Sequence, residues 1–328
     1  MTLFMDTNSL GELKVVALAG GVGGAKLAYG LAQILPGKNL TVVVNTGDDF
    51  DHFGLRICPD LDTVCYSLAG LANPISGWGM VDDTFTVLSA LKALGAPTWF
   101  SIGDKDMATH LERTRRLSMG ESLSEVTRYF TTQWGIKHHI LPMTDDTVRT
   151  MIMTKDEHCL AFQEYFVHQA CKPEVKGFIF EGIDRARPAP GLLESINLAD
   201  LIVICPSNPW VSIDPIIGIR DIKDALCCKT VVAVSPIVGG KAQKGPAAKM
   251  FSEMGIAPTA TSVMMHYNDL LTGFILDNLD SQEVVLMTQC NIIPYVTNTI
   301  MHQRDDKVRL AAEVLDFGRK ILLGEVYS

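Results

Sequence analysis

Residues 14–26 (KVVALAGGVGGAK) constrain the fold most, because an apolar run passes directly into four glycines and a lysine. The apolar run predicts a buried strand, and the chain from Lys26 onward predicts a helix. Glycines allow a tight turn in which backbone N–H groups approach a ligand, and the N-terminus of a helix favours an anion. We therefore predict a phosphate-binding turn, formed by Gly21, Val22, Gly23, Gly24 and Lys26.

This turn departs from both common nucleotide-binding motifs. Lys26 stands where the dinucleotide fingerprint has its third glycine, and Leu27 stands where a P-loop has Ser or Thr. A tight strand-to-helix turn without a ligand is the alternative interpretation. The pattern indicates a phosphate but does not identify the molecule that carries it.

The composition is that of an acidic chain with enough apolar residues for a large core. The 328 residues are 47% apolar and carry a formal net charge of -9, which disfavours nucleic acid and anionic membrane as partners. The eight cysteines form no C-x-x-C pair, and residues 1–13 lack the basic and apolar segments of a secretory signal. No apolar run is long enough to span a membrane. We expect a cytoplasmic protein with reduced cysteines.

The order of apolar runs predicts an α/β fold, a Rossmann-like, mostly parallel sheet with an inserted α+β region. A second strand is expected at 40–45, which completes a right-handed βαβ unit. Residues 14–60 and 195–328 would form the nucleotide-binding core, and residues 61–194 the insertion. The elements expected further along the chain are strands at 201–205 and 229–234, helices within 62–94 and 108–134, and strands at 147–154 and 159–168.

Polar loops follow three of these strands, at residues 45–49, 206–209 and 235–240. Ligands of such sheets bind beyond the carboxyl ends of the strands, so these loops should join the glycine turn at one edge. The candidate nucleotide contacts in the two later loops are Ser207, Asn208, Ser235 and Gly239. The last loop continues through Lys241, Lys244 and Lys249, and which lysine contacts the nucleotide stays open.

Carboxylates gather near the same edge. Asp48 and Asp49 follow the second strand, and Asp60 and Asp62 precede a predicted helix. Carboxylates of this kind bind Mg²⁺ and bridge it to substrate phosphates. We predict a Mg²⁺ site that includes Asp48, Asp49 and Asp62. The alternative for Asp62 is an N-cap of the helix from Thr63.

The segment GDKDMATH, residues 103–110, is a second candidate for the pocket wall. Asp104, Lys105 and Thr109 would contact a substrate carboxylate, phosphate or hydroxyl. The alternative is that Asp104 or Asp106 caps a helix and that the following arginines form a solvated face. No serine lies in a nucleophile elbow and the histidines lack metal-ligand spacing, so covalent catalysis is not indicated.

Taken together, these motifs resemble the 2-phospho-L-lactate transferase family of coenzyme F-420 biosynthesis. The resemblance runs from about Lys14 almost to the C-terminus. The motifs that carry it are AGGVGGAK (19–26), NTGDD (45–49), PDLDT (59–63), WG (78–79), DT (83–84), GDKD (103–106), ATH (108–110), LPMTDD (141–146), PSNP (206–209) and SPI (235–237).

The resemblance implies a transferase that joins a guanylylated phospho-acid to the deazaflavin Fo and releases GMP, with Mg²⁺. The phospho-acid could be 2-phospholactate, phosphoenolpyruvate or 3-phosphoglycerate. The guanosine diphosphate would bind the glycine turn with Lys26, and the two later loops. The insertion would cover the deazaflavin, and the family also suggests a homodimer, for which the apolar stretch 291–300 is a candidate interface.

Matching the motifs residue by residue, Asp62 corresponds to an aspartate that contacts Fo near the metal, and it could orient the attacking hydroxyl or act as general base. Ser101 aligns with a second Fo contact, at which relatives often carry a charged side chain. Asp104 and Thr109 complete the predicted Fo and phospho-acid region. Phosphoryl transfer of this kind requires positioning and charge neutralisation more than a covalent nucleophile.

Two other functions remain as alternatives. A related branch of the superfamily, the gluconeogenesis factors, binds nucleotide sugars as regulators rather than as enzymes. A nicotinamide oxidoreductase would use the same type of sheet, but the third glycine of its fingerprint is missing.

Overall fold

A computed structural model describes residues 10–267 and 269–325 of the chain. Its centre is a seven-stranded sheet in the order β14-β13-β10-β9-β1-β2-β5, and every neighbouring pair is parallel. The α/β class and the mostly parallel sheet expected from the sequence are therefore confirmed. The strands are β1 (Val15–Ala19), β2 (Leu40–Val44), β5 (His139–Pro142), β9 (Leu201–Ile204), β10 (Thr230–Val234), β13 (Gly273–Asp277) and β14 (Ile293–Thr297).

The strand order reverses between β1 and β9. From β1 the chain builds outward through β2 to β5, and from β9 it builds in the opposite direction to β14. The loops that follow β1 and β9 therefore part in opposite directions, which leaves a crevice beyond their carboxyl ends. This switch point positions the candidate site.

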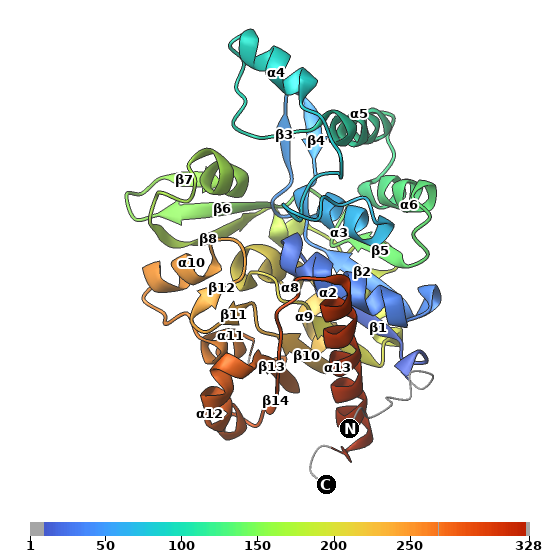
Figure 1. Cartoon of the computed structure of the whole chain (residues 1–328), viewed down its shortest axis with the longest axis vertical. Coiled ribbons are helices and arrows are strands. Elements are labelled where there is room, and N and C mark those ends of the chain that lie inside the picture. Colours follow the sequence, from blue (N-terminus) through green and yellow to red (C-terminus); the bar gives the residue numbers. More distant parts are fainter. Residues whose placement is uncertain (1–9, 268, 326–328) are drawn as a thin grey trace.

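Helices cover both faces of the sheet because the strand residues alternate between two cores. Val15, Ala17 and Ala19 of β1 belong to a core built with three helices: α2 (Gly21–Ile34), α3 (Pro59–Ala69) and α13 (Arg304–Leu323). Figure 1 shows α2 and α13 side by side, although they lie at opposite ends of the sequence. Val16 and Leu18 face the second core.

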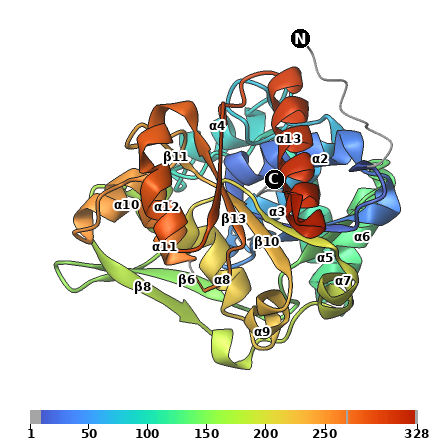
Figure 2. The same cartoon turned by 90° about the horizontal axis from the view of Figure 1, so that it is seen from below.

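The second core is covered by short helices from the C-terminal half of the chain. They surround β10 and β13 in the view of Figure 2. The helices are α7 (Leu192–Leu198), α8 (Asp214–Ile217), α9 (Ile222–Cys227), α10 (Ala247–Glu253), α11 (Ala260–His266) and α12 (Val284–Gln289). The hairpin β11 (Ile237–Val238) and β12 (Lys241–Ala242) leads into α10.

The middle of the chain adds three helices, a hairpin and a small antiparallel sheet. Helix α4 lies at the far end of the molecule above the hairpin of β3 and β4, and none of its residues is buried (Figure 1). The small sheet has the order β7-β6-β8. These elements are β3 (Phe50–His52), β4 (Leu55–Ile57), α4 (Thr86–Ala93), α5 (Asp104–Ser118), α6 (Leu123–Gln133), β6 (Arg149–Thr154), β7 (Cys159–Ala161) and β8 (Val175–Glu181).

Several local expectations were wrong. Helix α2 begins at Gly21 rather than at Lys26, so the glycines form its first turn. The helical periodicity of 62–94 is interrupted, because α3 ends at Ala69, Gly70 follows in a left-handed conformation with φ 72°, and α4 starts only at Thr86. The run 159–168 is a strand only to Ala161 and then becomes a π-helix at Glu164–His168.

The region 61–194 contributes to the main sheet as well as to the insertion. Strand β5 lies within it and pairs in parallel with β2. The domain boundaries at 60/61 and 194/195 stay a prediction, although β5, an edge strand of the main sheet, lies inside the segment that they delimit.

Two expectations concern the surroundings of the protein. Within residues 10–267 and 269–325, no helix is both long and apolar enough to cross a membrane. Residues 1–9, on which the expected lack of a secretory signal partly rests, lie outside the described residues. The candidate interface 291–300 contains β14, the edge strand of the sheet, and the homodimer stays a prediction.

Candidate active site

A pocket of about 550 Å³ lies at the carboxyl edge of the sheet. Residues from the loops after β1, β2, β9, β10 and β14 line it, together with parts of α3, α5 and the segments 76–79 and 243–247. Among the predicted nucleotide contacts, those that line this pocket are Gly21, Val22, Gly23, Lys26, Ser207, Asn208 and Ser235. The strand-end argument thus located one common pocket for residues far apart in the sequence.

The loops after β1 and β9 are joined directly at the switch point. The Ser207 Oγ accepts a hydrogen bond from the Gly20 N–H at 3.1 Å and donates one to the Gly20 carbonyl at 2.8 Å. A Cβ on Gly23 would lie 2.2 Å from the Pro206 carbonyl oxygen, and one on Gly24 would lie 2.6 Å from the Ser207 Oγ. These two glycines are therefore required by the packing of α2 against the β9 loop, whether or not a ligand is bound.

The first turn of α2 and two lysines form a cationic end of the pocket. Val22 and Gly23 line it, and the first N–H groups of a helix have no acceptor within the helix. The Lys26 Nζ donates to the Met301 carbonyl and the Lys244 Nζ to the Ser76 carbonyl, each at 2.6 Å. Burial lowers the pKa of Lys26, and the neighbouring charge of Lys244 lowers it further.

Two buried carboxylates, Asp48 and Asp60, lie beside this cationic end. The Asn45 Nδ2 donates to both at 3.0 Å, the Gln163 Nε2 donates to Asp48 at 2.9 Å, and the Gly21 N–H donates to Asp60 at 2.6 Å. Burial raises the pKa of Asp60 to about 6. Burial and the charge of Asp60 raise the pKa of Asp48 well above its usual value.

Asp62 belongs to a different buried network. It lies in the first turn of α3, where the N-cap residue is Cys58, so the N-cap interpretation of Asp62 was wrong. The Arg113 Nη2 donates to the Asp62 Oδ1, and both side chains are buried, with exposures of 3% and 9%. The Asp62 Oδ2 is buried without a hydrogen-bond partner among the described residues. Burial raises the pKa of Asp62, although Arg113 opposes the shift.

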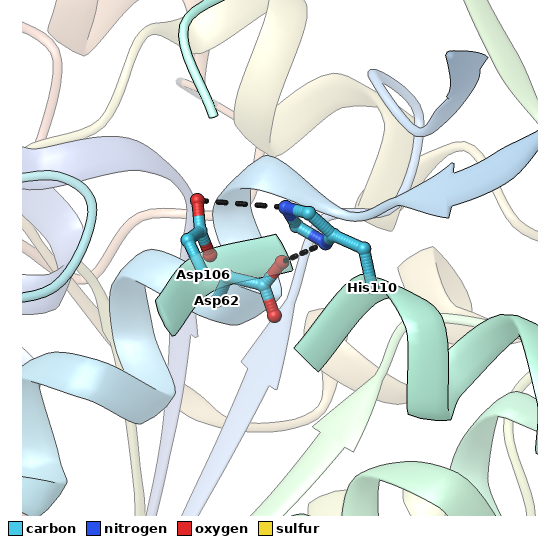
Figure 3. Close-up of side chains that lie close together, drawn as sticks. All are labelled: Asp62, Asp106 and His110. Carbon is cyan, nitrogen blue, oxygen red and sulfur yellow. Dashed lines mark ion pairs between the residues drawn. The ribbon is translucent and has the colours of Figure 1, made fainter. Parts of the chain in front are cut away.

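His110 connects Asp62 to Asp106, and Figure 3 shows one ring nitrogen facing each of the two carboxylates. Its Nδ1 is 3.6 Å from the Asp62 Oδ2, and its Nε2 is 3.4 Å from the Asp106 Oδ2. The Arg113 Nη1 lies 3.1 Å from the His110 Nδ1. A guanidinium can only donate, so Nδ1 accepts and the ring proton belongs on Nε2, facing Asp106. Tyr66 extends the network by donating to the Asp106 Oδ1 at 2.7 Å.

Two sets of side chains could hold a metal ion. The ligand atoms of Asp62, Asp106 and His110 lie within 4.8 Å of one another. Arg113, however, already neutralises Asp62 in this set. Asp48 and Asp60 form the second set. They are adjacent and buried, they line the pocket, and neither has an ion pair among the described residues. Their carboxylates are the oxygen ligands that Mg²⁺ prefers.

Other predicted site residues lie outside the pocket lining. Asp49 is buried, its Oδ1 has no hydrogen-bond partner among the described residues, and burial raises its pKa to about 8. Asp104 accepts hydrogen bonds from Thr84 and from the N–H groups that open α4, so it caps α4 rather than the helix to which it belongs. Direct contacts of Asp49 with a metal and of Asp104 with substrate stay predictions.

Thr109 and Gly239 also lie outside the lining, whereas Ser101 lies in it. The Thr109 hydroxyl donates a hydrogen bond to the Tyr66 hydroxyl oxygen at 2.9 Å, because the single Tyr66 proton goes to Asp106, and the Gly239 N–H donates to Asp280 at 3.0 Å. Both residues therefore support neighbours of the pocket. Their contacts with substrate stay predictions.

Sequence reasoning missed the aromatic wall and the role of Arg113. The aromatic residues of the lining are Tyr66, Trp78, Phe100, Phe162 and Phe166. Arg113 was assigned to a possible solvated face, yet Asp106, His110 and Arg113 have the i, i+4, i+7 spacing of one helix face. Polar residues at the spacing expected of a buried face were the available signal.

A doubly wound sheet with its pocket at the switch point defines an α/β protein that binds a ligand across the carboxyl edge. Comparison with known proteins identifies the family. Residues 15–314 match the family model described as 2-phospho-L-lactate transferase CofD. The chain therefore belongs to the 2-phospho-L-lactate transferase family.

Similar proteins cover most of the chain. A phosphoenolpyruvate transferase of Thermobifida fusca is 42% identical over an alignment of 295 residues that covers 86% of this chain and 92% of the relative. A 2-phospho-L-lactate transferase of Methanocaldococcus jannaschii is 39% identical, over 92% of this chain and 97% of the relative. A crystal structure of a UPF0052 family protein from Bacillus halodurans has a TM-score of 0.62 at 14% identity, covering 92% of this chain and 98% of that one, and is similar in fold alone.

Proposed function

We propose that the protein transfers a phospho-acid moiety from a guanosine-diphosphate-activated donor to the ribityl hydroxyl of Fo, 7,8-didemethyl-8-hydroxy-5-deazariboflavin, in coenzyme F-420 biosynthesis. The observation that carries the proposal is that a single pocket combines a cationic end at the first turn of α2 with Asp62, whose Oδ2 is buried without a hydrogen-bond partner among the described residues. The names of the relatives support the phospho-acid class. The donor is a phosphoenolpyruvate, 2-phospholactate or 3-phosphoglycerate derivative.

The donor's diphosphate lies at the first turn of α2 with Lys26, and its guanosine extends over the β9 and β10 loops. Asn208 supports this placement of the base. Its Oδ1 accepts from the Trp210 N–H at 3.1 Å, but among the described residues the only hydrogen-bond partner of its Nδ2 is the Met250 sulfur at 3.4 Å. Because sulfur is a weak acceptor, the amide can donate to the guanine O6 instead.

The deazaflavin ring lies against the aromatic wall, next to Ser101. Flat apolar rings stack well on aromatic side chains, and Phe100 is itself held by Phe50 at a centroid distance of 4.9 Å. This placement directs the ribityl chain toward Asp62, which lines the same pocket.

The chemistry assigned to Asp62 follows from its two oxygens. Arg113 holds Oδ1, so Oδ2 accepts the hydrogen bond of the ribityl hydroxyl. The hydroxyl oxygen attacks the phosphorus of the phospho-acid, its proton passes to the Asp62 Oδ2, and the bond from this phosphorus to the GMP phosphate oxygen breaks. GMP leaves with that oxygen, and Asp62 later releases the proton to water.

Mg²⁺ would be held by Asp48 and Asp60, and when bound it would neutralise charge on the diphosphate. Their mutual proximity supports this assignment: the Asn45 Nδ2 donates to both carboxylates, and the two can ionise together at one buried place only beside a cation. Of the predicted metal ligands, Asp48 is retained here, and Asp62 is assigned to the acceptor hydroxyl instead.

The setting of the reaction is part of the proposal. Eight free cysteines support a reducing cytoplasm. The outer edge of β14 supports a homodimer, because an unpaired parallel strand offers hydrogen-bonding groups to a second copy.

The experiment mixes the purified protein with Fo, Mg²⁺ and each of the three guanylylated phospho-acids, and follows GMP and the phosphorylated deazaflavin by mass spectrometry. We expect stoichiometric formation of both products with at least one donor, and none after chelation with EDTA. An adenylylated donor is the matched control for the base. Absence of product with all three donors from folded protein would refute the proposal, and binding of a nucleotide sugar instead would favour the regulatory alternative.

A further inference from the structure

The loop after β10 carries three lysines that the sequence could not distinguish, and the structure separates them. Lys241 lies in the exposed hairpin strand β12, outside the pocket lining. The Lys249 Nζ is paired with Glu253 on α10 and donates to the Pro173 carbonyl at 3.1 Å. Of the three, Lys244 alone lines the pocket.

The ammonium group of Lys244 lies close to the first turn of α2. A Cβ built on Gly77 would lie 3.4 Å from the Lys244 Nζ and 2.6 Å from the Val22 Cγ1. Gly77 therefore lies next to both Lys244 and Val22 of the first turn of α2, and the preceding Ser76 carbonyl accepts the hydrogen bond of Lys244 at 2.6 Å. Two loops separated by 168 residues are thus tied together across the pocket.

Lys244 retains unused donors in this position. An ammonium group has three N–H donors, and the hydrogen bond to Ser76 uses one of them. Among the described residues, no carboxylate oxygen lies within 4.0 Å of the Nζ of Lys244 or of Lys26, so neither lysine forms an ion pair there. Two lysines that repel each other at one end of a pocket, beside the N-terminus of a helix, are stabilised by an anion.

We infer that Lys244 binds the diphosphate of the guanosine nucleotide and, through Ser76, holds segment 76–79 over it. The inference rests on the proposed function, since it names a further residue of the donor site. The diphosphate would then lie between the first turn of α2 on one side and the Lys244 ammonium on the other. Trp78 belongs to the same segment, so donor binding would also order one residue of the aromatic wall.

The test compares Lys244→Met with Lys241→Met, which removes the same charge from the same loop outside the pocket. Calorimetry measures the affinities of GDP and guanosine for each variant and the wild type. One charge-assisted contact corresponds to about a ten- to hundredfold change in affinity, so we expect Lys244→Met to weaken GDP binding by this factor. Guanosine affinity should stay the same in every variant, and Lys244→Arg should recover most of the GDP affinity.

Each outcome is decisive. A wild-type protein that binds neither GDP nor guanosine would overturn the proposed function, and the inference with it. Wild-type GDP affinity in a folded Lys244→Met variant would overturn only the inference. An equal loss in Lys241→Met would also overturn it, because the effect would then come from the general charge of the loop.

Discussion

Replacing Asp62 by Asn is expected to lower both activity and stability, because the side chain has two partners of different kinds. Its Oδ2 is assigned to the acceptor hydroxyl, and its Oδ1 holds Arg113, whose side chain is 3% exposed. In Asp62→Asn the Arg113 guanidinium keeps its hydrogen bonds to the Arg56 carbonyl at 3.2 Å and to the His110 Nδ1 at 3.1 Å. It loses its only carboxylate partner among the described residues.

The magnitude follows from these contacts. Leaving a buried charge unpaired costs about 3–5 kcal/mol. Since Asn still offers an oxygen acceptor and two other acceptors remain, we expect a loss of about 2–3 kcal/mol in the free energy of unfolding. Losing the carboxylate that contacts the transition state should cost about 3 kcal/mol more in the activation barrier, which is roughly a hundredfold in rate.

Urea denaturation and single-turnover release of GMP measure the two effects separately. Arg113→Met is the companion variant, and the double variant closes the cycle. Removing both members of a buried ion pair is much less destabilising than removing one, so the two stability losses should be non-additive by about 2 kcal/mol. Activity should not recover in the double variant, because the hydroxyl acceptor is still missing.

Two results would contradict this reasoning. A stability of Asp62→Asn within about 0.5 kcal/mol of the wild type would mean that Arg113 does not depend on Asp62. Recovery of the rate in the double variant would mean that Asp62 acts only by neutralising Arg113.

Two further predictions concern the packing of α2 and the cap of α4. Gly23→Ala should lower the free energy of unfolding by about 2 kcal/mol, since its Cβ would lie 2.2 Å from the Pro206 carbonyl oxygen; an unchanged urea midpoint would be inconsistent with this close contact. Hydrogen bonds from Thr84 and the α4 backbone lower the pKa of Asp104 to about 2 from its usual 3.8. A carboxylate with a lowered pKa stabilises the fold above its unfolded pKa, and this contribution disappears as the pH falls through about 2. The rate of amide hydrogen exchange in α4, residues 86–93, corrected for the intrinsic rate, should therefore increase below pH 3.8 in the wild type. In Asp104→Asn this rate should be high and independent of pH. Equal protection in both proteins would exclude Asp104 as the cap.

Local patterns in the sequence determined the framework of the fold. The strand at residues 15–19, the glycines and the helix that follows were recognisable because apolar periodicity and glycine conformations are properties of neighbouring residues. The carboxyl-edge rule then placed Ser207, Asn208 and Ser235 in one pocket with the glycine turn, since all strands of a parallel sheet end at the same edge.

Only the tertiary structure decided which side chains meet at that edge. Asp62 and Arg113 are 51 residues apart and Ser76 and Lys244 are 168 apart, and no local pattern encodes such pairs. The spacing of Asp106, His110 and Arg113 places them on one face of α5, but only the tertiary structure showed that this face is buried, against Asp62 of α3 and against β4. Lys241, Lys244 and Lys249 were equivalent in the sequence for the same reason, because the path of the chain around the pocket determines which lysine faces the ligand.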